Sequence, residues 1–446
     1  MKFELHPNAA AEFNQKAQGL LLQLGAGEEC PQESFISDVL PAARFMTEDL
    51  DFMNQAFVDH VGNRLGYCFQ EEDGGLVGLT CDNYMESVRL VESIQRASPL
   101  KDKLSKRFIQ DAFLAWLEES YKKTIDIALM ECILALAEAH VSEKEVWIPI
   151  AAAYTEQEFQ VGRVTFRTIS REMFEPWQEQ NEAEQSDEVQ EFMRLLEQKQ
   201  RRLQGLMAAT IKVTAELTRA YEIALQEADK ATSVLRVFAS PLVTPGARLS
   251  FDLLGREGSE SDHYMVLEEG HSPAIMVGFA YRDKPPTMLS RDKIAMFDRL
   301  GLGTLSAILE NEPQTEFESA VLDMVFQYSK AAVAGSLSDQ LTYIFSALDQ
   351  FLLRDASEPI QQNIAERIAF VLGRGREERR AIIKNVKEAY GLRSRFIHHG
   401  KTVNDSIVLE PFLRTVWEFV IRAIHFSSKF ETKRAFLDDI ENARLS

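Results

Sequence analysis

The sequence predicts a mainly α-helical protein with small β insertions, whose C-terminal part is an antiparallel helical bundle. Three observations lead to this fold class. Apolar residues recur at three- and four-residue spacing through most of residues 1–145 and again from residue 313 onward. Strict alternation of apolar and polar residues, which is typical of strands, occurs only in short stretches. The chain has 446 residues, of which 45% are hydrophobic, and this length indicates about three globular units.

The N-terminal part, residues 1–175, is expected to be helical with a β-hairpin near 146–166, where alternation replaces the helical period. Residues 176–236 have apolar residues at helical spacing and predict a long helix or a helical hairpin. Either a core helix or a coiled-coil dimer arm fits that stretch. Residues 237–300 are rich in Pro and Gly turns and predict a small β-containing segment, so two small β-sheets or hairpins are expected in all.

The last part, residues 301–446, predicts a bundle of five or six helices joined by short loops. Gly373 and Gly391 are expected to end two of these helices, and Pro359 fits the first turn of another. The helices are expected at 315–334, 338–353, 358–372, 376–390, 406–428 and 432–443.

The charge is unevenly distributed. The whole chain has a net charge of −20, and residues 1–300 carry −18 of it. This acidity excludes a general nucleic-acid coat protein. The window 366–401 is nevertheless net +6, and Arg376, Arg380, Lys384 and Lys387 recur on one side of a predicted helix. Such a stripe is typical either of a solvated helix face or of a surface that holds a nucleic-acid backbone.

The sequence also argues against several other classes of protein. No apolar run reaches the length of about 20 residues that spans a bilayer, and the first residues lack a secretory signal, so we expect a cytoplasmic protein without a membrane partner. The four cysteines do not have the spacing of a metal knuckle. Neither a phosphate-binding loop nor a dinucleotide fingerprint occurs. We therefore expect no metal and no cofactor.

One stretch carries residues suited to chemistry: Ala-Tyr-Gly-Leu-Arg-Ser-Arg-Phe-Ile-His-His-Gly-Lys at 389–401. Arg393 can bridge two phosphate oxygens, and the imidazoles of His398 and His399 can transfer protons near neutral pH. With the hydroxyl of Ser394, these groups could cleave RNA without a metal, through attack of the ribose 2′-hydroxyl on the adjacent phosphorus. Arg395 and Lys401, together with the basic stripe, are the candidate RNA-binding residues.

The same stretch resembles the HEPN superfamily, and in particular its Apea-like branch. The superfamily signature is Arg, four to six residues and then His, which this chain matches from Arg393 to His398. Supporting residues occur at 347–352 and 366–373, and the resemblance covers about residues 315–430. It implies a helical domain that dimerises so that two copies of the motif face one cleft. It also implies a metal-independent endoribonuclease, with a role in a toxin or antiviral defence system.

Helix geometry leaves the pairing of these residues open. His398 comes five positions after Arg393, so on a regular helix the two side chains point about 140° apart. The two converge only if the turn is irregular, if the Arg393 side chain bends back, or if a partner chain supplies one of them. Arg393 with His399, or Arg395 with His399, are alternative pairs. A second Arg and His pair, Arg256 and His263, is at the level expected by chance and is set aside.

Structural and non-catalytic alternatives also remain. Arg393 and His398 could form a polar network with Asp349 or Glu366, and His399 could simply cap its helix. The bundle would then be a module that binds a nucleotide, an RNA or a protein without cutting it. The acidic N-terminal part has no catalytic constellation and is a candidate sensor of a protein or phage-derived trigger.

Overall fold

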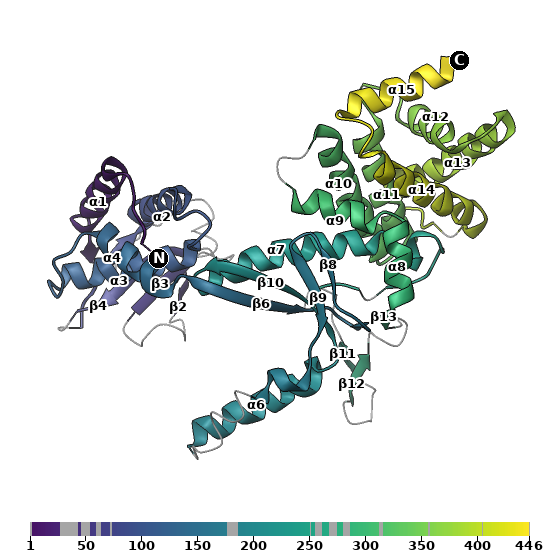
Figure 1. The fold of residues 1–446 in the computed structure, drawn as a ribbon. Helices are drawn as coiled ribbons and strands as arrows, with labels where there is room; N and C mark the ends of the chain where they lie inside the picture. Colours follow the sequence, from purple (N-terminus) through teal and green to yellow (C-terminus); the bar gives the residue numbers. More distant parts are fainter. Residues whose placement is uncertain are drawn as a thin grey trace. The chain divides into compact units, whose positions relative to one another are not determined.

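The structure is a computed structural model that describes residues 2–26, 43–45, 54–58, 64–71, 74–175, 186–249, 251–254, 261–266, 274–279, 286–311, 315–355, 357–403 and 405–445 (Figure 1). The chain forms two compact units. The first comprises Met1–Val146 and Lys212–Ile223, and the second comprises Trp147–Ile211 and Ala224–Ser446. The chain is mainly helical with small sheets, as predicted.

The first unit packs helices against an antiparallel sheet. The helices are α1 (Pro7–Leu21), α2 (Cys81–Arg96), α3 (Lys106–Tyr121) and α4 (Leu129–His140). The strands are β1 (Gly25–Ala26), β2 (Ala43–Phe45), β3 (Asn54–Val58), β4 (Arg64–Gln70) and β5 (Leu76–Thr80), in the order β1-β5-β4-β3-β2. Phe113 and Trp116 of α3 are fully buried in the core of this unit.

This five-stranded sheet was not predicted from the sequence. Its strands are short, and an apolar run such as Leu76–Thr80 has the same pattern in a strand as in a buried helix turn. The register places Gly78 opposite Cys68, where an added Cβ would lie 2.1 Å from the Tyr67 carbonyl oxygen. The glycine therefore permits a close approach of two strands that only the folded sheet makes visible.

The predicted hairpin near 146–166 is present. Strands β8 (Phe159–Val161) and β9 (Val164–Thr168) pair in antiparallel fashion across Gly162, whose φ is +58°. They belong to a sheet of order β6-β10-β9-β8, in which β6 is Ser142–Pro149. In the predicted β-containing segment, β11 (Ser261–Val266) pairs with β12 (Ala274–Phe279), and β13 (Thr287–Leu289) pairs with β7 (Ala153–Thr155).

The prediction of a long helix or helical hairpin at 176–236 is wrong in its middle part. Helices α6 (Asp187–Leu203) and α7 (Leu217–Arg236) are separated by strand β10 (Met207–Ala215), while 176–185 lie outside the described residues. Strand β10 is buried along almost its whole length and pairs with β9. A strand that is buried on both faces does not alternate apolar and polar residues. The apolar residues of β10 therefore fitted the helical spacing of the segments before and after it.

The second unit ends in the predicted helical bundle, which two unpredicted helices, α8 (Arg291–Arg299) and α9 (Leu302–Glu310), precede. Each bundle helix overlaps one that the sequence predicts. They are α10 (Glu316–Ser329), α11 (Leu337–Leu352), α12 (Ile360–Leu372), α13 (Arg376–His399), α14 (Ser406–Phe426) and α15 (Lys433–Leu445).

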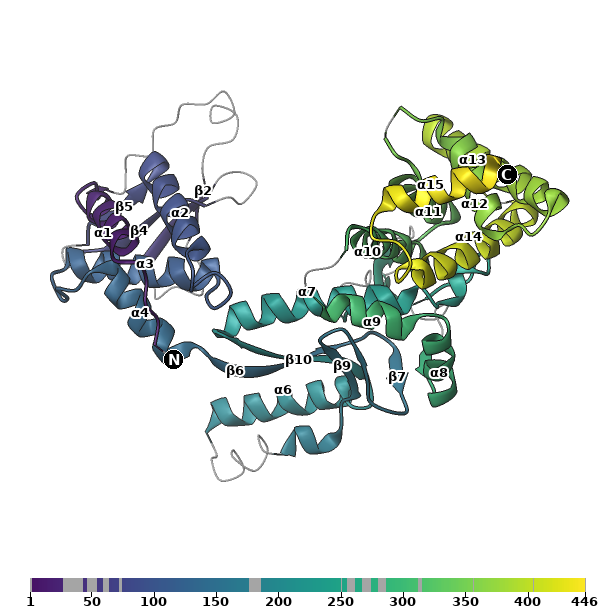
Figure 2. The same cartoon turned by 45° about the horizontal axis from the view of Figure 1, so that its top comes forward.

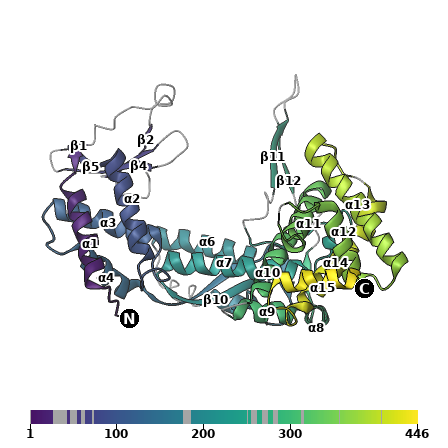
Figure 3. The same cartoon turned by 90° about the horizontal axis from the view of Figure 1, so that it is seen from above.

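The bundle core is rich in phenylalanine. The Phe317 ring lies 5.2 Å from that of Phe436 and 5.7 Å from that of Phe351, centroid to centroid. Helix α13 packs beside α12 and α14 (Figures 2 and 3). No helix among the described residues is long and apolar enough to cross a membrane.

Candidate functional site

The motif lies in the last two turns of α13, which runs without interruption to His399. The prediction that a helix ends at Gly391 is therefore wrong. Glycine in a helix interior costs only about 1 kcal/mol relative to alanine, and the buried side chains of Ala389 and Leu392 hold this part of α13 against the bundle. The end of the helix is set instead by Gly400, whose φ of +63° is the left-handed conformation that favours glycine. Gly373, by contrast, ends α12 as predicted.

The end of α13 displays its charged and imidazole groups to solvent. Arg395, His398, His399 and Lys401 are exposed, whereas Arg393 and Ser394 are half-buried. The rings of His398 and His399 are 6.5 Å apart, and neither imidazole has a hydrogen-bond partner among the described residues. Arg395 and His399 share one exposed face, as their four-residue spacing predicts.

Arg393 faces a different direction from the histidines. Its guanidinium carbon lies 5.7 Å from the centre of the Tyr390 ring, which is one turn toward the N-terminus of α13. Helix α13 is regular here, so the irregular turn that would bring Arg393 and His398 together is not present. In this conformation the Arg393 side chain extends toward Tyr390 and not toward His398.

Arg393 instead lies near Asp349 of α11. Burial raises the pKa of the Asp349 carboxyl to about 6, although the positive charge of Arg393 acts to lower it. One oxygen of Asp349 and the Nε of Arg393 are buried without a hydrogen-bond partner. Unsatisfied buried groups and perturbed pKa values are concentrated at functional sites. The sequence indicated Asp349 only as a structural partner, since its burial depends on the packing of α11 against α13.

The other proposed structural partner is engaged elsewhere. Glu366 of α12 forms an ion pair with Arg444 of α15, at 2.8 Å between nitrogen and oxygen. A polar network that joins Glu366 to the motif is therefore not observed. The half-buried polar pair of this site is Arg393 with Asp349.

The basic stripe occupies the opposite, N-terminal half of α13. Arg376, Arg380 and Lys384 are exposed, while Lys387 is half-buried and donates a hydrogen bond to Gln362. The stripe is not purely cationic, because Arg380 donates to Glu377 at 3.1 Å and Lys384 lies 3.9 Å from Glu388. At a rise of about 1.5 Å per residue, the four cations lie roughly 17–33 Å along the helix from His398.

A groove of about 500 Å³ lies where α13 ends and α14 begins. Arg395 and Lys401 line it together with Asp405, whose carboxylate accepts a hydrogen bond from the Val408 amide and so caps α14. The groove is therefore lined both by cationic groups of the motif and by a capping carboxylate. Sequence reasoning did not find Asp405, because only the folded bundle brings it into the same groove as Arg395.

The raised pKa of Asp349 makes a prediction about stability. The folded state holds this proton to about pH 6, whereas an unfolded aspartate releases it near pH 4. Stability should therefore fall as pH rises between these values. We expect Asp349→Asn to remove this slope and to raise the free energy of unfolding at pH 7.5 by about 1 kcal/mol, as measured by urea denaturation at several pH values. A variant that is less stable than the wild type at every pH would show that Asp349 stabilises the bundle as an ion-pair partner.

These features define a class of protein: a mainly helical chain whose C-terminal bundle presents an arginine and two exposed imidazoles at one helix end. Comparisons with protein-family models, with curated proteins and with solved structures found no significant match to this chain.

Within the described part of the chain, no three His, Cys, Asp or Glu side chains gather as metal ligands would. Of the pair set aside earlier, Arg256 lies outside the described residues and His263 is in β11.

Proposed function

We propose that the C-terminal bundle is a HEPN-like, metal-independent endoribonuclease that acts as a homodimer in the cytoplasm. The observation that carries this proposal is the exposed pair of imidazoles at the end of α13, one turn from a half-buried arginine whose Nε has no hydrogen-bond partner. Arginine and histidine at this spacing can supply the charge stabilisation and proton transfer that RNA cleavage requires.

In the proposed reaction, the ribose 2′-hydroxyl loses its proton to a general base and its oxygen bonds to the adjacent phosphorus. The bond from phosphorus to the 5′-oxygen breaks, and a general acid protonates that oxygen. The products are a 2′,3′-cyclic phosphate and a 5′-hydroxyl end. His398 is the proposed acid or base, Arg393 stabilises the charge on the phosphoryl oxygens, and Ser394 and His399 orient these groups. Asp349 would position Arg393.

The separation of Arg393 and His398 on α13 supports the dimeric form of this proposal. Since Arg393 and His398 leave a regular helix on different faces, a second copy of the chain that contributes one of them would bring both to one phosphate. A two-fold axis near the end of α13 would place Arg393 of one protomer opposite His398 of the other.

A non-catalytic module is the second candidate function. The position of Arg393 beside Asp349 favours it, because a charge held in this way can serve structure or binding rather than cleavage. In that case the end of α13 and the groove with Arg395 and Lys401 would bind a nucleotide, an RNA or a protein without cutting it. In either case, the N-terminal part is the proposed sensor of a protein or phage-derived trigger, in a toxin or antiviral role.

Incubating the purified full-length protein with RNA and an excess of chelator distinguishes the two functions. The nuclease proposal predicts fragments that end in 2′,3′-cyclic phosphate, detected by their resistance to phosphatase until the ring is opened with acid. RNA that is bound tightly but remains intact, across structured and unstructured substrates, supports the non-catalytic module and contradicts the nuclease.

The basic stripe makes a further prediction. Replacing Arg376, Arg380 and Lys384 by alanine should weaken RNA binding and reduce the slope of log affinity against log salt by about 2, since each lost phosphate contact to single-stranded RNA contributes about 0.7. Titrations at several salt concentrations measure this slope. A matched triple variant of Arg194, Lys199 and Arg201, which are exposed on α6, should retain the wild-type slope. Equal losses in both triple variants would mean that only overall charge matters.

A further inference from the structure

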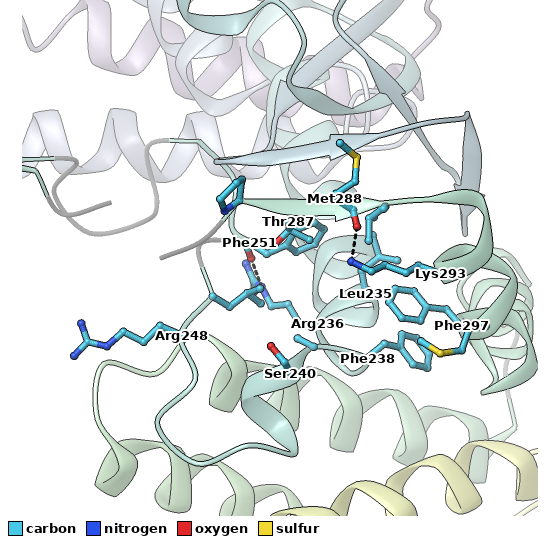
Figure 4. Close-up of a pocket in the computed structure, with 15 residues that line it drawn as sticks. Leu235, Arg236, Phe238, Ser240, Arg248, Phe251, Thr287, Met288, Lys293 and Phe297 are labelled. Carbon is cyan, nitrogen blue, oxygen red and sulfur yellow. Dashed lines mark hydrogen bonds between the residues drawn. The ribbon is translucent and has the colours of Figure 1, made fainter. Parts of the chain in front are cut away.

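A small pocket lies in the second unit, away from the motif (Figure 4). It has a volume of about 270 Å³ and is formed by the end of α7, the segments around Ser240 and Phe251, strand β13 and helix α8. This volume is near the lower end of the range for small-molecule sites. The pocket is therefore large enough for a ligand of one or two rings.

The walls of the pocket are apolar and aromatic. The rings of Phe238 and Phe297 are stacked, with centroids 4.8 Å apart, and lie side by side in Figure 4. Met288 and Met296 line the pocket and are 47% and 41% exposed. The flexible thioether of methionine adapts to ligands of different shape.

The charged groups of the pocket are cationic. Lys293 donates a hydrogen bond to the Met288 carbonyl oxygen at 2.9 Å, as drawn in Figure 4, and two of its N–H donors remain. Among the described residues, none forms an ion pair with Lys293. Arg236 also lines the wall, but it is satisfied by the Phe251 carbonyl oxygen and by Asp252. The guanidinium of Arg248 points away from the other labelled side chains.

None of the described residues that line the pocket is acidic, although the chain as a whole has a net charge of −20. A lysine with free donors beside stacked aromatic rings and methionines matches a ligand with an apolar body and one negative group. We propose that this pocket binds a small organic anion with an aromatic or branched apolar body. Its anionic group would accept hydrogen bonds from Lys293, and its apolar body would pack on Phe238, Phe297 and Met296.

Dansyl sulfonate (5-dimethylaminonaphthalene-1-sulfonate) is a suitable probe, since it joins a two-ring aromatic body to one negative charge, and dansylamide is its neutral counterpart. We expect the full-length protein to bind the sulfonate at one saturable site, measured by fluorescence titration. Lys293→Glu should weaken sulfonate binding by about tenfold or more and leave binding of the neutral probe unchanged. Met296→Trp, which introduces a larger side chain into the lining of the pocket, should weaken binding of both probes.

Lys199→Glu on α6 is the matched control, because Lys199 is also an exposed helical lysine and the change in net charge is the same. It should bind both probes as the wild type does. The proposal is overturned if Lys293→Glu and Lys199→Glu bind the sulfonate equally well, if Met296→Trp binds both probes normally, or if the wild type shows no saturable site. Circular dichroism of each variant establishes that the fold is retained, so a loss of binding reports on the pocket.

Discussion

Replacing either Arg393 or His398 by alanine is expected to lower the rate of RNA cleavage by about 10²–10⁴-fold. The loss of Arg393 removes the cation proposed to stabilise the phosphoryl oxygens, and the loss of His398 removes the proposed proton donor or acceptor. His398 is exposed, so its replacement should leave the fold intact. Single-turnover cleavage of a labelled RNA, with chelator present, measures the effect.

The dimeric site makes a sharper form of this prediction. If each active site takes Arg393 from one protomer and His398 from the other, mixing the two inactive variants should restore activity, because some mixed dimers carry one intact site. His140→Ala, at an exposed histidine of the first unit, is the control and should cleave normally. Full activity in the Arg393→Ala, His398→Ala double variant would refute the assignment.

The largest expected effect on stability comes from Arg367, whose side chain is 4% exposed. It donates hydrogen bonds to both carboxylate oxygens of Glu358 at 2.7 and 2.8 Å, to the Leu352 carbonyl oxygen and to Glu441 of α15. Arg367→Ala would leave the largely buried Glu358 without its cation. We expect a loss of about 3–5 kcal/mol, seen as a fall in the melting temperature on the order of 10 °C.

The effect of Arg367 should depend on pH. Its hydrogen bonds lower the pKa of Glu358 to about 2 from the usual value of 4.5. The stabilisation is therefore complete above about pH 4.5 and is lost as pH falls toward 2, so the difference between wild type and variant should shrink over that range. Arg434→Ala, which removes an exposed pair with Asp438 at 3.8 Å, should change stability by less than about 1 kcal/mol. Similar melting temperatures for both variants would mean that the buried network contributes little.

The helices of the bundle were predictable because each has a continuous apolar stripe and recognisable ends, such as Thr315 capping α10 and Gly373 ending α12. Strand β10 and the sheet of the first unit could not be predicted in this way. Their residues are buried on both faces or form very short strands, and in such segments the local pattern does not distinguish strand from helix. Pairing with strands distant in the sequence decides their conformation.

The sequence by itself determined the mainly helical class, the bundle at the C-terminus and the presence of Arg393, His398 and His399 within one short segment. Only the tertiary structure decided that α13 continues through Gly391, because the cost of one glycine is smaller than the gain from burying Leu392. It likewise decided that Arg393 lies beside Asp349 while the imidazoles face solvent. Which groups share a buried environment, and hence which pKa values shift, depends on the packing of helices far apart in the chain.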